Sequence, residues 1–167
     1  MRLADKVAIV TGAGSGMGAS IAQTYAREGA KIAVLDVEEK AGRAVAGEIG
    51  ENAIFLRCDV AKRSDIDAAI AATLKAFGSL DILVNNAGVS HVNKPVLEIS
   101  EAEFDRVFAI NVKGLFLFSQ AVVPAFRKNG GGVIVNIGST AGLRPRPGPL
   151  PSRSRRPAAR PSLWPRT

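Results

Sequence analysis

A run of glycines near the start of the chain has the spacing of a phosphate-binding loop. The segment TGAGSGMG, residues 11–18, follows a short β-branched run and precedes a helical pattern. Gly12 allows a sharp turn, Gly16 allows a ligand to approach the backbone, and Gly18 allows the helix to pack close to the strand. The N–H groups at the start of that helix would face phosphates. This context predicts a dinucleotide site rather than a merely flexible loop.

An acidic residue follows at the spacing expected for a ribose contact. Asp36 ends the apolar run KIAVLD, 18 residues beyond Gly18, where an acid about 20 residues on takes the ribose hydroxyl. Its carboxylate would repel a 2′-phosphate, and neither Ser15 nor Val37 supplies a cation to offset the repulsion. We therefore predict NAD rather than NADP. Asp36 could instead cap the helix that follows, and both roles are compatible.

Four further motifs appear along the chain, and with the glycine loop they resemble the short-chain dehydrogenase/reductase family. They are CDV at residues 58–60, NNAG at 85–88, NVKG at 111–114 and NIGS at 136–139. The five motifs stand in the family's order and span residues 6 to about 143. The resemblance implies hydride transfer between a nicotinamide cofactor and an alcohol or ketone carbon of a small-molecule substrate. It also implies that full-length relatives form homo-oligomers.

The resemblance assigns roles to individual residues. Ser139 would orient the substrate carbonyl, and Asn111 would hold a water in a proton relay. Asp59 would contact the adenine amine. The cofactor-binding residues that the resemblance implies are Thr11, Gly12, Ser15, Gly16, Met17, Gly18, Asp36, Asp59, Val60, Asn86, Ala87 and Gly88.

The central catalytic pair of the family is missing from this sequence. The family uses a Tyr as general acid/base and a Lys four residues later, because a phenol needs a nearby cation to act at neutral pH. The corresponding region, residues 149–156, contains neither, and Arg156 would have no phenol to act on. The sole tyrosine, Tyr25, lies in the first predicted helix, and the last lysine is Lys128. We expect a catalytically impaired enzyme or, alternatively, a non-catalytic NAD-binding module.

Composition separates a neutral domain from a basic tail. The chain is 47% hydrophobic and 22% charged, with a net charge of +7. Residues 1–143 contain 15 basic and 15 acidic residues, so residues 144–167, with seven Arg, seven Pro and no acid, carry all of the net charge. This proline density is incompatible with helix or strand, and we predict a disordered tail, which out-of-frame translation would explain. Binding of nucleic acid or an acidic surface by the tail is a less favoured alternative.

Short apolar runs alternate with helical patterns, which predicts an α/β fold with a Rossmann-like, doubly wound parallel sheet, truncated after the fifth strand. The expected strand order 3-2-1-4-5 leaves the fifth strand at an edge that is apolar on both faces. Ser64 is expected to cap the third helix, and Ser100 with Glu103 forms a capping box for the fourth. The predicted strands are residues 6–12, 31–36, 53–59, 80–88 and 131–139, and the predicted helices are 18–28, 38–49, 64–77 and 101–128.

The remaining residues point to a reducing compartment. A single cysteine excludes an internal disulfide. We predict that this residue, Cys58, is a small buried hydrophobic residue. The start MRLADKVAIVTG does not resemble a signal peptide, and no apolar run was expected to approach a membrane span, so we predict the cytoplasm. His91 could contact substrate or be a solvated bystander, and no metal site is indicated. We expect the phenylalanines of the long helix to serve in packing rather than to form a ligand site, and some of them could face a partner subunit. They are Phe104, Phe108, Phe116 and Phe118.

Overall fold

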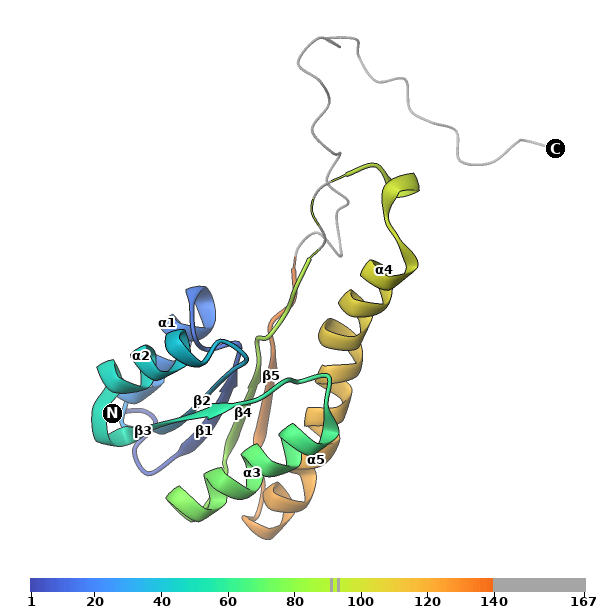
Figure 1. Ribbon diagram of the computed structural model, residues 1–167. Helices are drawn as coiled ribbons and strands as arrows, with labels where there is room; N and C mark the ends of the chain where they lie inside the picture. The colour runs from blue at the N-terminus through green and yellow to red at the C-terminus, as the bar shows by residue number, and fades with distance from the viewer. Residues whose placement is uncertain (91, 93, 140–167) are drawn as a thin grey trace, which may run out of the picture.

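The computed structural model describes residues 1–90, 92 and 94–139 and contains one parallel sheet of five strands. The strand order β3-β2-β1-β4-β5 confirms the predicted order (Figure 1). Each neighbouring pair is parallel, with Val10 level with Val34 on one side and with Val84 on the other. The strands are β1 (Val7–Thr11), β2 (Lys31–Asp36), β3 (Ala53–Arg57), β4 (Ile82–Asn85) and β5 (Val133–Asn136).

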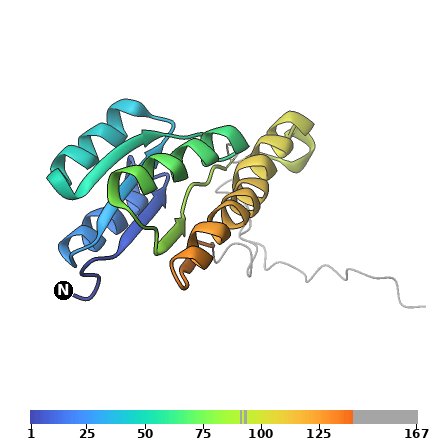
Figure 2. The same cartoon turned by 90° about the horizontal axis from the view of Figure 1, so that it is seen from below.

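Helices cover both faces of the sheet, as the doubly wound class requires (Figure 2). Helices α1 and α2 pack on one face, and α3 and α5 pack on the other. The helices are α1 (Gly16–Arg27), α2 (Glu39–Ile49), α3 (Arg63–Phe77), α4 (Glu101–Phe108) and α5 (Leu115–Lys128), with short 3-10 turns at Gly50–Asn52 and Val96–Glu98. The carboxyl ends of the strands therefore open onto a single edge of the sheet, where the loops that carry the motifs meet.

Two apolar cores follow from the alternation of side chains along the buried strands. Ile9 and Leu83 point to the face under α3 and α5, where Ile66, Phe118 and Val122 complete the core. Val10 and Val34 point to the opposite face, under α1 and α2. Tyr25 packs at the margin of this second core, as its position in the first helix predicted. The strands are hydrophobic without interruption because both faces of this sheet are covered.

The long fourth helix is interrupted, which the sequence did not predict. Residues Ala109–Gly114 form a π-helix, η3, between α4 and α5. The predicted capping box at its start is confirmed, because the N–H of Glu103 donates to Ser100 Oγ at 3.3 Å and the N–H of Ser100 donates to Glu103 Oε2 at 2.9 Å. Lys94 Nζ also donates to Glu103 Oε2 at 2.7 Å. The hydrogen bonds from Lys94 and Ser100 lower the pKa of Glu103 to about 2.

The start of α3 and the exposure of the phenylalanines differ from expectation. Helix α3 begins at Arg63, with Lys62 at the cap position, so Ser64 lies inside the first turn instead of capping it. Phe118 is buried, but Phe104, Phe108 and Phe116 are about half exposed. The packing interpretation is confirmed for Phe118, whereas the rings of Phe104 and Phe108 stack on each other with centroids 4.3 Å apart and stay half exposed. That part of the set faces a partner subunit stays a prediction.

The combined helix Glu101–Lys128 is longer and more apolar than expected. Its 28 residues include a stretch of mean hydropathy 1.5, enough in length and composition to cross a membrane. The expectation that no apolar run approaches a membrane span was therefore wrong. This is weak evidence for a membrane segment, because helices of soluble cores have the same properties, and Phe118, Val122 and Phe126 of this helix pack onto the sheet.

The β5 edge contrasts with the centre of the sheet. All five residues of β1 are buried, whereas Val133, Ile134 and Asn136 of β5 are exposed. Within the described ranges, β5 pairs only with β4. Two predictions, the boundary at Leu143 with the disordered tail 144–167 and the role of His91, lie outside the described residues.

Candidate functional site

The glycine loop joins the end of β1 to the start of α1 and leaves its backbone open. Gly16, the first residue of α1, has a φ of 54°, a conformation that favours glycine, and nothing lies within 4 Å of the place a Cβ would occupy. Gly18 is the opposite case, since a Cβ there would run into the carbonyl oxygen of Gly12 and the side-chain amide of Asn86. The loop is therefore open toward solvent at Gly16 and closely packed at Gly18, as the spacing predicted.

A hydrogen-bonded unit fixes the glycine loop to the end of β4. Thr11 Oγ1 donates to the carbonyl of Val84 at 3.2 Å and accepts from the N–H groups of Asn86 and Ala87, both at 3.0 Å. The side-chain amide of Asn86 donates to the carbonyls of Thr11 at 2.9 Å and Gly12 at 3.1 Å. Thr11 is buried. Its hydroxyl and the Asn86 amide are thus engaged in holding the two loops together.

Asp36 lies at the end of β2 with its carboxylate held by backbone donors. Asp36 Oδ2 accepts from the N–H of Gly14 at 2.8 Å, and Oδ1 accepts from the N–H of Glu38 at 3.0 Å. The residue at the cap position of α2 is Glu38, so Asp36 supports the turn before α2 without being its N-cap. Each oxygen keeps a further lone pair for a hydroxyl donor.

The turn after β3 brings a second carboxylate to the same edge. Asp59 Oδ1 accepts from the N–H of Ala61 at 3.0 Å, and Lys62 Nζ lies 3.7 Å from Asp59 Oδ2. Cys58 is buried beside it, and burial, followed by the nearby charges of Asp65 and Asp59, raises the pKa of the Cys58 thiol to about 12. The thiol is therefore neutral and unreactive at physiological pH, in agreement with its interpretation as a small buried hydrophobe.

These elements enclose a cavity of about 430 Å³, which we call the glycine-loop cavity. All of the residues expected to bind the cofactor line it except Thr11, which is buried behind the loop. Its lining also contains Val37, Cys58, Val89 and Ile110, to which the sequence analysis assigned no contact with the cofactor. The residues that were predicted and line the cavity are Gly12, Ser15, Gly16, Met17, Gly18, Asp36, Asp59, Val60, Asn86, Ala87 and Gly88.

A second cavity of about 630 Å³, the Asn111 cavity, adjoins the first and shares Met17, Asn86 and Gly88 with it. It brings together Asn111 from η3 and Ser139 from the segment after β5. The sequence predicted that these two residues act at one site, and the structure places both on one cavity wall. Among residues 1–90, 92 and 94–139, neither cavity is lined by a Tyr or a Lys.

The side chain of Asn111 clamps the loop that follows β4. Its Oδ1 accepts from the N–H of Val89 at 2.9 Å, and its Nδ2 donates to the carbonyl of Val89 at 2.8 Å. A π-helical segment of this kind often marks a functional position. Because the amide is occupied at both ends, a water held by Asn111 would use a remaining oxygen lone pair of its side chain or backbone.

A polar pair links the two strands that end at the Asn111 cavity. Asn85 and Asn136 are level with each other on β4 and β5, and Asn85 Nδ2 donates to Asn136 Oδ1 at 2.9 Å. The same amide lies 3.3 Å from Ser119 Oγ of α5. This network ties strand β5 to its neighbour three residues before Ser139. No group of His, Cys, Asp and Glu that could hold a metal ion occurs among the described residues.

Comparison with known proteins gives consistent matches over most of the chain. A sequence model of the family described as short chain dehydrogenase matches residues 6–150. The chain is 43% identical to 4-formylbenzenesulfonate dehydrogenase of Comamonas testosteroni, over 89% of this chain and 60% of that protein. It is 44% identical to sorbitol dehydrogenase of Cereibacter sphaeroides, over 86% of this chain and 56% of that protein. The chain thus spans somewhat more than half the length of these relatives.

A solved structure shows the same arrangement. The crystal structure of 3-ketoacyl-(acyl-carrier-protein) reductase from Brucella melitensis, complexed with NADH, superimposes with a TM-score of 0.85 at 43% sequence identity. The match covers 87% of this chain and 62% of that one.

Proposed function

Because the chain belongs to the short-chain dehydrogenase family, we propose that it binds NAD(H) in the glycine-loop cavity. The observation that carries this proposal is the placement of Asp36, whose carboxylate lines the same cavity as the open backbone at Gly16. Helix α1 would direct its N-terminal N–H groups at the pyrophosphate, and Asp36 would accept from the ribose hydroxyls. The similar reductase of Brucella melitensis was solved with NADH, which supports the choice of cofactor.

The preference for NAD over NADP rests on charge. The Asp36 carboxylate is held in place by the N–H groups of Gly14 and Glu38, so it cannot turn away from a 2′-phosphate without losing two hydrogen bonds. The cavity lining contains no Lys or Arg among the described residues. A 2′-phosphate would therefore meet an anion without a compensating cation.

The reaction that we propose for this site is hydride transfer between the cofactor and a small alcohol or ketone. Bound NAD(H) supplies the hydride acceptor or donor. Ser139, which lines the Asn111 cavity, would donate a hydrogen bond to a substrate oxygen, and Asn111 holds the loop at Val89 in position. The relatives named above are dehydrogenases of small molecules, which supports a substrate of this class.

Catalysis by this chain also requires a group that exchanges a proton with the substrate oxygen. A proton must reach or leave the substrate oxygen, and the sequence places neither Tyr nor Lys after Ser139. Removing a general acid/base lowers rates by about 10²–10⁴-fold. We therefore propose that this chain binds NAD(H) with strongly impaired catalysis. The absent pair equally favours the second candidate, a non-catalytic NAD-binding module. The cytoplasmic location and the tail domain at 144–167 stay predictions.

Titration calorimetry with NADH and NADPH tests the cofactor proposal. We expect NADH to bind at least about tenfold more tightly, which corresponds to ~1.4 kcal/mol, and Asp36→Ala to reduce the difference. Glu38→Ala is the matched control, because it removes a neighbouring carboxylate that does not line the cavity. Equal or tighter binding of NADPH by the unchanged chain would refute the assignment.

A panel of alcohols and ketones tests the catalytic part of the proposal independently. We expect no turnover above background from the purified chain, even where NADH binds. Ordinary enzymatic rates would show that the proton is carried by a group other than the family's Tyr and would overturn the impaired-catalysis proposal, while leaving the cofactor assignment intact.

A further inference from the structure

The backbone conformation at Gly14 does not require a glycine. In the same loop, Gly12 and Gly16 have φ values of 62° and 54°, which favour glycine, whereas the φ of Gly14 is not positive. An alanine could therefore adopt the backbone conformation of Gly14 without strain. What limits this position is space, because a Cβ there would lie 2.9 Å from Asp36 Oδ2 and 3.2 Å from the Cβ of Ala41 in α2.

Gly14 also holds the carboxylate for which it leaves room. Its N–H donates to Asp36 Oδ2 at 2.8 Å, and the N–H of Ala13 donates to the carbonyl of Leu35 at 3.0 Å. Two consecutive residues of the glycine loop are thus bonded to two consecutive residues at the end of β2. Gly14 itself does not line the glycine-loop cavity, whereas Asp36 does. Gly14 can therefore act on a ligand in this cavity only through its neighbours, and Asp36 is the one that it contacts by a hydrogen bond.

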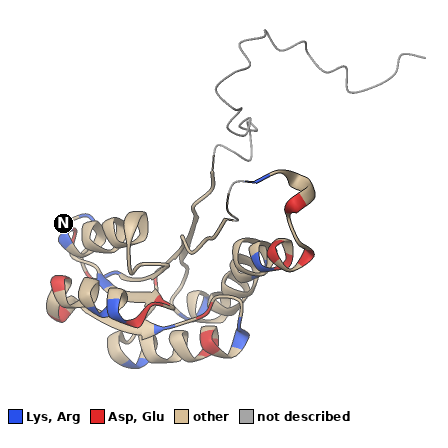
Figure 3. Cartoon of the chain, turned by 45° about the horizontal axis from the view of Figure 1, so that its top comes forward, with Lys and Arg blue, Asp and Glu red and all other residues tan. Residues whose placement is uncertain are grey.

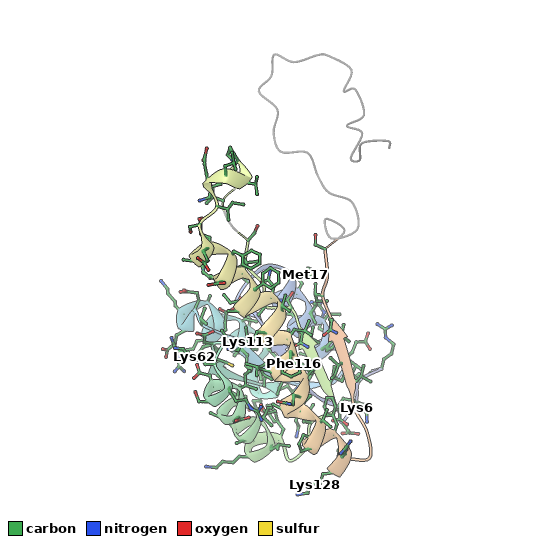
Figure 4. All side chains as sticks on the ribbon, turned by 90° about the vertical axis from the view of Figure 1, so that its right-hand side faces the viewer. Lys6, Met17, Lys62, Lys113, Phe116 and Lys128 are labelled. Carbon is green, nitrogen blue, oxygen red and sulfur yellow. The ribbon has the colours of Figure 1, made fainter. Side chains whose placement is uncertain are left out.

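The charges around the cavity make the exact place of the Asp36 carboxylate important. In the view of Figure 3, acidic and basic residues are intermixed over the helices, so no surface of one sign directs a phosphate to the site. Lys62 and Lys113, both labelled in Figure 4, do not line the glycine-loop cavity. Lys62 Nζ instead lies 3.7 Å from Asp59 Oδ2. The distance between the Asp36 carboxylate and a 2′-phosphate therefore decides how strongly the phosphate is repelled.

We propose that Gly14 is a positioning residue for cofactor selection, an inference that rests on the NAD(H) binding proposed above. It fixes the Asp36 carboxylate at the ribose position through its N–H and through its lack of a side chain. A methyl group at residue 14 forces Asp36 Oδ2 away, breaks this hydrogen bond and leaves the carboxylate held by the N–H of Glu38 at 3.0 Å. A carboxylate that can turn binds the ribose hydroxyls less well and repels a 2′-phosphate less strongly.

Titration calorimetry of the full chain with NADH and NADPH tests the proposal. We expect Gly14→Ala to reduce the preference for NADH about threefold or more, which is less than the strength of one hydrogen bond to a charged acceptor. In the Asp36→Ala background the same methyl group should leave the preference unchanged, because the carboxylate that it displaces is gone. Gly18→Ala is the matched control. Its Cβ would meet Gly12 and Asn86 instead of Asp36, so it should weaken the binding of both cofactors alike.

The outcomes separate this inference from the proposed function. An unaltered preference in folded Gly14→Ala, or an equal effect of the methyl group with and without the Asp36 carboxylate, would overturn the positioning role and leave NAD(H) binding in place. If the unchanged chain prefers NADPH, or binds neither cofactor, the proposed function is wrong and this inference is wrong with it.

Amide hydrogen exchange followed by NMR tests the same contact without substituting the glycine. In Asp36→Ala the N–H of Gly14 loses its acceptor, and we expect it to exchange at least about tenfold faster than in the unchanged chain. The N–H of Ala13 is the internal control and should keep its rate, because it donates to the backbone carbonyl of Leu35. Equal exchange of the Gly14 N–H in both chains, or equal acceleration of both amides, would overturn the proposal even if Gly14→Ala does not fold.

Discussion

The β1 side and the β5 side of the same sheet are completed in different ways. On the β1 side, every residue of β1 is buried, and the glycine loop is fixed by Thr11 and Asn86 within the chain itself. On the β5 side, the side chains of Asn85 and Asn136 link β5 to β4, while Val133 and Ile134 of β5 are exposed. The cofactor half of the site is therefore preorganised by local contacts, whereas the half around Ser139 depends on what covers β5.

The largest expected effect comes from truncating neighbouring side chains on β4 and β5. Leu83 and Ile134 are level with each other in the sheet, but Leu83 is fully buried and Ile134 is 37% exposed. We expect Leu83→Ala to lower the free energy of unfolding by about 2–5 kcal/mol and Ile134→Ala by about 1 kcal/mol or less in the monomer. Urea denaturation at low protein concentration measures both values.

The concentration dependence of that pair sharpens the comparison. If Ile134→Ala becomes more costly only at high concentration, a second copy covers β5. If the two variants lose equal stability at every concentration, the two sides of the sheet are equally closed, and the contrast between them is wrong.

A smaller effect is expected from adding one methyl group within the glycine loop. A Cβ at Gly18 would run into the backbone of Gly12, so Gly18→Ala should cost about 1–3 kcal/mol and weaken NADH binding. Gly47→Ala in α2, where nothing lies within 4 Å, should instead stabilise the chain by about 0.5–1 kcal/mol. Thermal unfolding and NADH calorimetry check both. Unchanged NADH affinity in Gly18→Ala would show that the loop is less rigid than its hydrogen bonds indicate.

The smallest effect concerns the start of α4, where a capping carboxylate has a lowered pKa. Since the folded-state pKa of Glu103 is about 2 and its ordinary value is 4.5, its stabilisation is present above about pH 4.5 and is lost as the pH falls toward 2. The difference in melting temperature between the unchanged chain and Glu103→Gln should therefore shrink over this range. Glu101→Gln removes an equal charge from the same turn without this contact. A difference independent of pH would contradict the assignment.

The sequence predicted the β1 side well because its signals are local. A glycine spacing between a strand and a helix requires particular backbone geometry, and an acid at the end of the next strand must lie at the same sheet edge. The strand order followed from the doubly wound fold class, and the structure confirms it. The hydrogen bond from Gly14 to Asp36 was not predicted, since it depends on a side-chain rotamer that no spacing specifies.

The β5 side was predicted less well because its details depend on packing. The pattern of Glu101–Lys128 has helical periodicity throughout, and nothing in it distinguishes a π-helical turn from an α-helical one. The structure also shows that a Cβ at Gly114, the last residue of this turn, would lie 3.0 Å from Val60, a close approach that the sequence did not predict. The burial of Thr11 was missed for a similar reason, as its motif identifies the residue but not which way its side chain points.

The π-helical turn at Ala109–Gly114 also sets how α4 is rotated about the helix axis relative to α5. A π turn holds one residue more than an α turn, and each residue advances an α-helix by about 100°. Removing one residue from this turn would leave α5 seated on the sheet but rotate α4 about the helix axis by roughly that angle. Asn111 would then lose its alignment with Val89, so the length of this turn, as much as the identity of its residues, sets the angle at which the loop after β4 meets the cavity.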